Sequence, residues 1–167
     1  QTTPKRVVTF ICDSGNKYLS KMFNDYWMID HGFITRPKVG DLRDLISRRH
    51  EERATITVGP EDTVATSMHR MKIYDISQLP VVEGEKIVGM VDEYDLLRTV
   101  GLGVAALKKS IKEVMTQRLI TVSPSASIAE LMPIFERGEV VIVEDGGRFL
   151  GLITKMDVIN YLRQQIA

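Results

Sequence analysis

The sequence predicts an α/β fold in which one β-α-β-β-α unit, with a small three-stranded sheet, occurs twice in tandem. The first observation is a repeat: residues 57–100 and 121–162 both run through T-V-x-P, a helical stretch, β-branched residues, an acidic turn with glycine and a short closing helix. The second is length, because 167 residues make one domain or two small ones. The third is an apolar share of 44%, which is enough to bury a core.

The chain opens with a fragment of an α/β layer. Residues 5–12 (KRVVTFIC) form a run of β-branched and aromatic residues that is typical of a strand buried on both faces. Turn-forming residues follow, and residues 17–28 carry apolar side chains at helical spacing. One strand and one helix cannot cover their own apolar faces. Residues 35–41 (TRPKVGD) then have the composition of a linker.

Each copy is predicted to begin with a short leading helix, at 41–49 and 108–116, and with a strand that ends in T-V-x-P. Pro60 and Pro124 stand where prolines often open the next helix. The second copy is about three residues shorter before its hairpin, so its main helix should be shorter, and Pro133 should bend that helix or delay its start.

A β-hairpin with an acidic, glycine-containing turn is predicted at 78–91 and again at 140–153. Closing helices follow at 93–100 and 155–165, and residues 101–106 (GLGVAA) join the copies. A copy of about fifty residues has a marginal core by itself. We therefore expect the copies to pack back to back with pseudo-two-fold symmetry and to form two equivalent clefts between them.

Composition excludes several functions. The 22 basic and 22 acidic residues balance, which argues against a nucleic-acid partner. The single cysteine, Cys12, excludes an internal disulfide and fits a reducing compartment, the cytoplasm. His31, His50 and His69 share no ligand spacing, so no metal site is predicted. The sequence shows neither a membrane-spanning run nor a signal peptide, and because it begins with Gln we expect a longer parent.

The repeat resembles the CBS domain, and the tandem resembles a Bateman module. Residues 76–97 (ISQLPVVEGEKIVGMVDEYDLL) and 140–159 (VVIVEDGGRFLGLITKMDVI) carry this resemblance. Residues 7–33 are similar to the C-terminal edge of the PLP-dependent catalytic domain of cystathionine β-synthases, which a Bateman module follows. The implied domains are 1–35, the edge of a catalytic domain; 36–102, the first CBS domain with its linker; and 103–167, the second CBS domain.

The resemblance implies that this chain is not an enzyme by itself. In cystathionine β-synthases a Schiff-base lysine far upstream holds PLP, so we expect no cofactor here and PLP only in the catalytic domain of the parent. Asp13 and Ser14 resemble a loop of that domain, but a plain turn capped by Ser14 or Asn16 is the simpler interpretation. Ser14, Asp13 and His31 have no spacing that would order a catalytic base.

CBS domains bind adenosine-containing ligands at the start of the closing helix, through a Thr or Ser and an Asp three residues later. Thr154 and Asp157 match this pair. An Asp accepts both hydroxyl hydrogens of a ribose diol, and a helix N-terminus offers free N–H groups. The alternative is that Thr154 caps the helix and Asp157 completes a capping box. One residue can serve both roles.

Matching the S-adenosylmethionine cleft of the family residue by residue extends the set. Ala54 would lie over the adenine, and the segment that begins at Ile76 would surround the base, partly through backbone groups. Core packing is the alternative for the apolar members of that segment, and Ile76 stands where the family often has an aromatic ring. The implied ligand-binding residues are Ala54, Ile76, Gln78, Leu79, Val81, Thr154, Met156 and Asp157.

The other cleft is predicted to be degenerate. Asp92 replaces the Thr and Asp95 keeps the Asp, while Arg137 and Glu139 take the facing strand positions. The converging carboxylates would repel an anionic nucleotide. The alternative is that Asp92 is an N-cap within a solvated cluster of ion pairs.

The leading functional hypothesis is a regulatory module that senses an adenosyl ligand, S-adenosylmethionine first and AMP or ATP second, and acts on its own catalytic domain in transsulfuration and cysteine metabolism. The alternative is a structural oligomerisation module with vestigial clefts. A homodimer is expected because Bateman modules usually pair through their flanking helices and because aromatic side chains near the start need partners. These are Phe10, Phe23, Tyr26, Trp27 and Phe33.

Overall fold

The computed structural model describes residues 21–166 except for the side chains of Tyr26 and Asp30, together with five earlier residues: Pro4, Arg6, Val8, Phe10 and Tyr18. The chain divides into two compact units, residues 1–37 and 38–167. In the first unit, helix α1 (Asp25–Asp30) is shorter than the helix predicted over 17–28. The predicted strand at 5–12 falls mostly outside the described residues, as do Asp13 and Ser14.

Helix α1 begins after Asn24, whose side-chain oxygen accepts a hydrogen bond from the Trp27 N–H at 3.3 Å. The Trp27 ring stacks on His31 with 4.0 Å between ring centroids. Phe23 and Phe33 leave 61% and 65% of their surface exposed. The predicted dimer is not tested by this exposure and stays a prediction.

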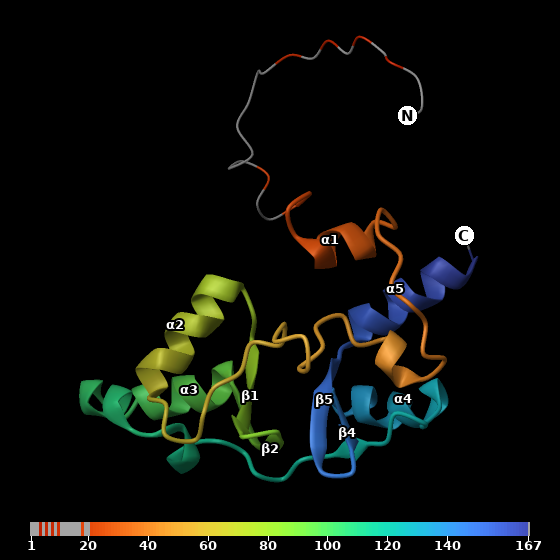
Figure 1. Ribbon diagram of the computed structural model, residues 1–167. Helices are drawn as coiled ribbons and strands as arrows, with labels where there is room; N and C mark the ends of the chain where they lie inside the picture. The colour runs from red at the N-terminus through yellow and green to blue at the C-terminus, as the bar shows by residue number, and fades with distance from the viewer. Residues whose placement is uncertain are drawn as a thin grey trace. The chain divides into compact units, whose positions relative to one another are not determined.

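The second unit contains both copies of the predicted β-α-β-β-α unit, so the predicted fold class is confirmed (Figure 1). The first copy comprises α2 (Val64–Tyr74), β1 (Gln78–Glu83), β2 (Lys86–Asp92) and α3 (Glu93–Val100). The second comprises β3 (Thr121–Val122), α4 (Ile128–Glu136), β4 (Val141–Asp145), β5 (Arg148–Ile153) and α5 (Lys155–Ile166). The domain boundaries predicted within this unit stay predictions.

The sheet of the second copy has the order β3-β4-β5, with β3 parallel to β4 and β4 antiparallel to β5. In the first copy β1 and β2 pair antiparallel, and the third strand is reduced to a parallel bridge between Val58 and Val81. The predicted three-stranded sheet is therefore complete in the second copy only. Both hairpins close over two-residue turns that contain glycine at positive φ, Gly84 in one and Gly146 with Gly147 in the other.

The main helices start later than their prolines. Thr63 caps α2 by accepting the Thr66 N–H, and Ser127 caps α4 in a capping box with Glu130. Pro60 and Pro124 therefore lie about one turn before the helices that they were expected to open. Helix α4 has 9 residues against 11 in α2, as predicted, and it continues through Pro133 rather than starting after it.

The leading helices predicted at 41–49 and 108–116 are wrong in length. Each is a single turn of 3-10 helix, η2 (Leu42–Asp44) and η4 (Ile111–Glu113), and a third such turn, η3 (Val104–Lys108), lies in the connection between the copies. The Asp44 carboxylate accepts the N–H groups of Val39 and Gly40 at 2.8 Å each. These bonds favour a turn over a continuing helix, because they bind the side chain to backbone that precedes it.

The leading segments are exchanged between the copies. The first leading segment (residues 41–50) contributes Leu42, Leu45 and Ile46 to the buried core that α4, β4 and β5 build. The Leu42 N–H donates to the Pro124 carbonyl at 2.9 Å. In Figure 1 this segment, drawn in orange, lies beside α4 and α5 rather than beside α2 and α3.

The second leading segment (residues 108–116) does the reverse. Ile111 and Val114 lie in the core of the first copy, and the Ile111 N–H donates to the Asp62 carbonyl at 2.8 Å. Thr116 pairs with Met90 of β2. Each copy therefore completes the core of the other, which gives a physical reason for the repeat, because a copy without its partner would lose part of its core.

A glycine in each hairpin makes room for the crossing. A Cβ atom on Gly151 of β5 would lie 2.5 Å from the Ile46 side chain, and a Cβ atom on Gly89 of β2 would collide with the Met115 sulfur. Only glycine lets backbone approach this closely.

Candidate functional site

A cavity of about 320 Å³ lies where the first leading segment meets both copies; we call it the Asp157 pocket. Four of the eight predicted ligand-binding residues line it: Ile76, Gln78, Thr154 and Asp157. The structure thus brings together residues from the end of α2, from β1 and from the start of α5. The complete lining is Ser47, Arg48, Thr55, Ile56, Asp75, Ile76, Ser77, Gln78, Pro80, Leu152, Thr154 and Asp157.

The other four predicted residues do not line the pocket. Leu79 and Val81 are fully buried in the core of the first copy, so their side chains have the packing role that was the alternative. Met156 is 59% exposed on α5 and lies outside the lining. Ala54 also lies outside, and the two residues after it line the pocket instead.

Asp157 is the polar centre of the pocket. Its Oδ2 atom accepts the Thr154 N–H at 2.7 Å and the Thr154 hydroxyl at 2.6 Å. The Asp157 N–H donates to Thr154 Oγ1 at 3.3 Å. The capping box that was the alternative is therefore formed, and it fixes the carboxylate at the N-terminus of α5. The role of this pair in ligand binding stays a prediction.

The second carboxylate oxygen contacts the first leading segment. The Ser47 hydroxyl donates a hydrogen bond to Asp157 Oδ1 across 110 residues of sequence. Ser47 and Arg48 were missed by sequence reasoning because they were assigned to a leading helix of the first copy. No local pattern marks them, since their place in the pocket results from the exchange of leading segments.

Charged side chains at the rim of the pocket were also unexpected. Arg48 brings a guanidinium, and Asp75 brings a carboxylate from the residue that ends α2 in the left-handed conformation, with φ of 52°. In the described part of the chain, no carboxylate forms an ion pair with Arg48. Both residues are exposed and line the pocket.

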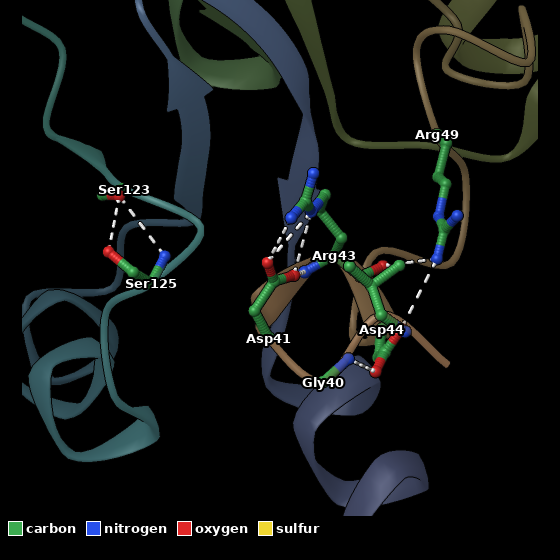
Figure 2. A network of polar contacts seen from close by, with 8 residues as sticks. Gly40, Asp41, Arg43, Asp44, Arg49, Ser123 and Ser125 are labelled. Atoms are coloured by element: carbon green, nitrogen blue, oxygen red, sulfur yellow. Dashed lines mark hydrogen bonds and ion pairs between the residues drawn. The ribbon is translucent and has the colours of Figure 1, made fainter. Parts of the chain in front are cut away.

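A polar network holds the first leading segment in place (Figure 2). The Arg43 guanidinium forks onto the Asp41 carboxylate at 2.6–3.0 Å, and these hydrogen bonds lower the pKa of the Asp41 carboxyl. Arg49 donates to the Arg43 carbonyl at 3.1 Å and lies 3.7 Å from the Asp44 carboxylate. These contacts position the backbone on both sides of Ser47.

The opposite cleft, which we call the Asp95 cleft, has a volume of about 190 Å³. Asp92, Asp95 and Glu139 line it as predicted, whereas Arg137 lies outside the lining and pairs with Glu139 at 3.4 Å. Arg118 brings a positive charge that sequence reasoning missed. Asp92 caps α3 by accepting the Asp95 N–H at 2.8 Å, so the N-cap alternative is formed here too.

Burial raises the pKa of the Asp95 carboxyl. The negative charge of Asp92 raises it further, although the hydrogen bond from the Asp92 backbone opposes this effect. An anion in this cleft would add to the same repulsion. The predicted degeneracy of the cleft is consistent with this charge distribution and stays a prediction.

None of the described helices is long and apolar enough to span a membrane. Within the same residues, no group of three or more His, Cys, Asp or Glu side chains is arranged to hold a metal ion.

Comparison with known proteins gives the same tandem arrangement. The sequence pattern of the CBS domain family matches residues 40–101 and 111–164. The chain is 28% identical to cystathionine beta-synthase of Dictyostelium discoideum over 95% of its length, and 23% identical to the Apis mellifera protein of the same name over 95%. It is 34% identical to inosine-5'-monophosphate dehydrogenase of Korarchaeum cryptofilum over 64% of its length. It spans only 34%, 33% and 22% of these relatives.

Solved structures show the same fold. A putative acetoin utilization protein from Vibrio cholerae superimposes with a TM-score of 0.65 and 23% identity, over 75% of this chain and 92% of that one. A CBS-domain protein in complex with AMP superimposes with a TM-score of 0.66 and 20% identity, over 76% of this chain and 98% of that one. A CBS domain pair in complex with 5'-methylthioadenosine and S-adenosyl-L-methionine has a TM-score of 0.59 and 21% identity, over 77% of this chain and 99% of that one. This chain therefore belongs to the CBS domain family and carries two CBS domains in tandem.

Proposed function

We propose that this chain is a regulatory module that binds one adenosyl ligand per chain, S-adenosylmethionine in preference to AMP or ATP, in the Asp157 pocket. The observation that carries the proposal is the Asp157 carboxylate, fixed at a helix N-terminus inside a cavity of about 320 Å³. Small-molecule sites have volumes of about 300–1,000 Å³, so the Asp157 pocket reaches this range and the Asp95 cleft does not. Solved relatives of the same fold hold AMP, 5'-methylthioadenosine and S-adenosylmethionine.

The charges of the pocket support the choice of ligand. Asp75 and Asp157 bring two carboxylates, and Arg48 brings one guanidinium. S-adenosylmethionine carries a sulfonium, an ammonium and a carboxylate, whereas AMP is a dianion near neutral pH. A zwitterionic tail can pair with both Arg48 and Asp75, while a phosphate dianion would gain Arg48 but face two carboxylates. None of the eight residues predicted to bind the ligand is an arginine or a lysine, so Arg48 adds a cation to the expected site, but S-adenosylmethionine stays the favoured ligand.

The walls of the pocket suit an adenine ring but offer it no aromatic stacking partner. Ile56 and Pro80 line the cavity beside the predicted base-binding residue Ile76. These side chains contribute dispersion and buried area, and Gln78 can exchange hydrogen bonds with the ring edge. Affinity should therefore be moderate compared with a site that stacks adenine on an aromatic ring.

We further propose that the parent protein is a PLP-dependent cystathionine β-synthase. The matches to two proteins of that name cover 95% of this chain, so they include residues that precede the CBS domains, whereas the match to inosine-5'-monophosphate dehydrogenase covers 64%. In such a parent, occupancy of the pocket would act through residues 35–41 on the catalytic domain. PLP would be held in that catalytic domain, and no chemistry of this chain passes through it.

Isothermal titration calorimetry tests the proposed ligand. The expected result is one S-adenosylmethionine per chain, bound more tightly than AMP or ATP. Arg48→Ala should weaken the binding of S-adenosylmethionine, because the carboxylate of that ligand loses its guanidinium partner. The binding of adenosine, which has no carboxylate, should stay nearly unchanged. Tight ATP binding without S-adenosylmethionine binding would refute the proposal.

A second candidate function is oligomerisation, and a groove between α2 and α3 favours it. The groove has a volume of about 690 Å³, and six of its ten lining residues are apolar: Met68, Met71, Ile76, Leu96, Leu97 and Val100. Lys72, Asp75, Ser77 and Glu93 complete the lining, and the groove shares Asp75, Ile76 and Ser77 with the Asp157 pocket. Apolar grooves on this scale are usually covered in proteins that stay soluble, and a second copy of this chain is the predicted occupant. Light scattering at high concentration separates the cases, since a monomer throughout would contradict the predicted homodimer.

A further inference from the structure

We propose that the Ser47 hydroxyl occupies the ligand-facing oxygen of Asp157 in the unliganded protein, and that a ribose hydroxyl displaces it on binding. Ser47 would then set the affinity of the site and couple its occupancy to the first leading segment. This inference rests on the proposed function, because it concerns how the Asp157 pocket accepts an adenosyl ligand.

The two carboxylate oxygens of Asp157 accept hydrogen bonds from different residues. Oδ2 serves the capping box, since it accepts both the N–H and the hydroxyl of Thr154. Oδ1 accepts a hydrogen bond from the Ser47 hydroxyl, its one partner among the described residues. A ligand that bonded Oδ2 would have to break the cap of α5, which is worth about 1 kcal/mol. Each carboxylate oxygen has two acceptor sites, so Thr154 fills Oδ2, whereas Oδ1 keeps one open site beside the one that Ser47 takes. A ribose diol that donates both of its hydrogens to Asp157 without breaking the cap needs both sites of Oδ1, and Ser47 is the group it must displace.

Ser47 lies between two firmly held points. Ile46 is 1% exposed in the core of the second copy. The His50 N–H donates to the Leu150 carbonyl at 2.8 Å, and its ring packs on Phe149 with 5.1 Å between centroids. A displacement of Ser47 is thus confined to residues 47–49 and cannot be absorbed by sliding the whole segment.

Contacts lead from these residues toward the linker. Arg49 contacts the Asp44 carboxylate, which in turn holds the N–H groups of Val39 and Gly40 (Figure 2). The Arg49 Nε atom is buried without a hydrogen-bond partner among the described residues, so this side chain is not fully satisfied in its present position. Release of Ser47 therefore affects a chain of contacts that ends at Val39 and Gly40, within residues 35–41.

The Asp95 cleft supplies a matched control. Aligning Leu42 with Ile111 and Leu45 with Val114 places Ser47 opposite Thr116. Thr116 lines the Asp95 cleft, but in the described part of the chain its hydroxyl forms no hydrogen bond with Asp95. Thr116→Ala thus removes a hydroxyl from the corresponding position without removing a competitor.

Calorimetry with adenosine, which carries the diol and lacks a charged tail, tests the competition. Ser47→Ala should bind adenosine about three- to tenfold more tightly, because the ligand no longer displaces a hydrogen bond to a carboxylate. Thr116→Ala should match the unmodified protein, and 2',3'-dideoxyadenosine should gain nothing from Ser47→Ala. Thermal melts establish that each variant is folded.

Hydrogen exchange at the amides of residues 47–50 tests the coupling. Exchange should rise in Ser47→Ala without ligand and in the unmodified protein when adenosine is added. If adenosine binds the unmodified protein but Ser47→Ala binds it equally or more weakly, the inference is overturned and the proposed function stands. Unchanged exchange on binding overturns the coupling, and absence of adenosyl binding to either protein overturns both the proposed function and the inference.

Discussion

The closing helices α3 and α5 begin with the same capping geometry, yet their surroundings differ. At α5 the Asp157 carboxylate meets a serine of the first leading segment in a cavity of about 320 Å³. At α3 Asp95 meets a second carboxylate, that of Asp92, in a cavity of about 190 Å³. The repeat thus supplies two similar helix N-termini. Whether each of them suits a ligand is decided by the side chains that the exchanged segments and the facing strands bring to it.

The largest expected difference between the two clefts concerns ligand binding. Asp157→Ala removes the acceptor for the ribose diol, and a hydrogen bond to a charged group is worth about 1.5–3 kcal/mol, so affinity for S-adenosylmethionine should fall about ten- to a hundredfold. Asp95→Ala should leave affinity nearly unchanged. Calorimetry of both variants gives the comparison, together with the stoichiometry of the unmodified protein.

Folding must be measured beside binding for this pair. Loss of a capping side chain typically costs about 1 kcal/mol, and both aspartates take part in capping boxes. Two equivalent sites per chain would break the comparison. So would a loss of binding in Asp95→Ala that Asp157→Ala does not show.

The next effect concerns the exchanged segments. Gly151→Ala places a Cβ atom against Ile46 and 3.2 Å from the Arg48 carbonyl, and overpacking of this kind costs about 1–3 kcal/mol of unfolding free energy. Gly89→Ala places a Cβ atom 3.1 Å from the Thr116 carbonyl, but its severe collision is with the flexible Met115 side chain, which can move more easily than the branched Ile46, so it should cost less. Urea unfolding measures both. Equal costs would indicate that the two crossings are equally tight.

The pH dependence of stability should differ in sign between two aspartates. Because burial raises the pKa of Asp95 in the folded state, its contribution to stability is present below the unfolded pKa of 3.8 and is lost as pH rises through the folded pKa. Because Arg43 lowers the pKa of Asp41, that contribution is present above 3.8 and is lost as pH falls through the folded pKa.

Substitution by asparagine separates these signs. As pH rises from about 3 to 6, the melting temperature of Asp95→Asn should increase relative to that of the unmodified protein. Over the same interval the melting temperature of Asp41→Asn should decrease relative to that of the unmodified protein. Thermal melts at several pH values make the measurement. Parallel pH profiles in the two variants would show that the two carboxylates are equally well accommodated.

The smallest effect concerns His50, which aligns with Leu119, three residues after the second leading segment. Burial lowers the pKa of His50, so its contribution to stability is present above the unfolded pKa of 6.5 and is lost as pH falls through the folded pKa. His50→Leu should reduce the loss of stability between about pH 7 and 5. A profile identical to that of the unmodified protein would mean that His50 is hydrated enough to charge freely.

The sequence by itself determined the elements whose signals are local. The β-branched residues on either side of acidic, glycine-containing turns predicted both hairpins, and the closing helices were predicted directly after them. The three-residue spacing of Thr154 and Asp157 predicted a polar pair at the start of α5, because capping geometry depends only on neighbours in the chain.

Only the tertiary structure decided what surrounds that pair. The helix expected over 41–49 became a single turn because Asp44 bonds the backbone before it. The same segment then crossed to the second copy, where Gly151 leaves room for it, and brought Ser47 and Arg48 to Asp157. A contact between residues 110 apart leaves no periodicity or spacing in either segment, since it arises from burying apolar side chains of one copy in the core of the other.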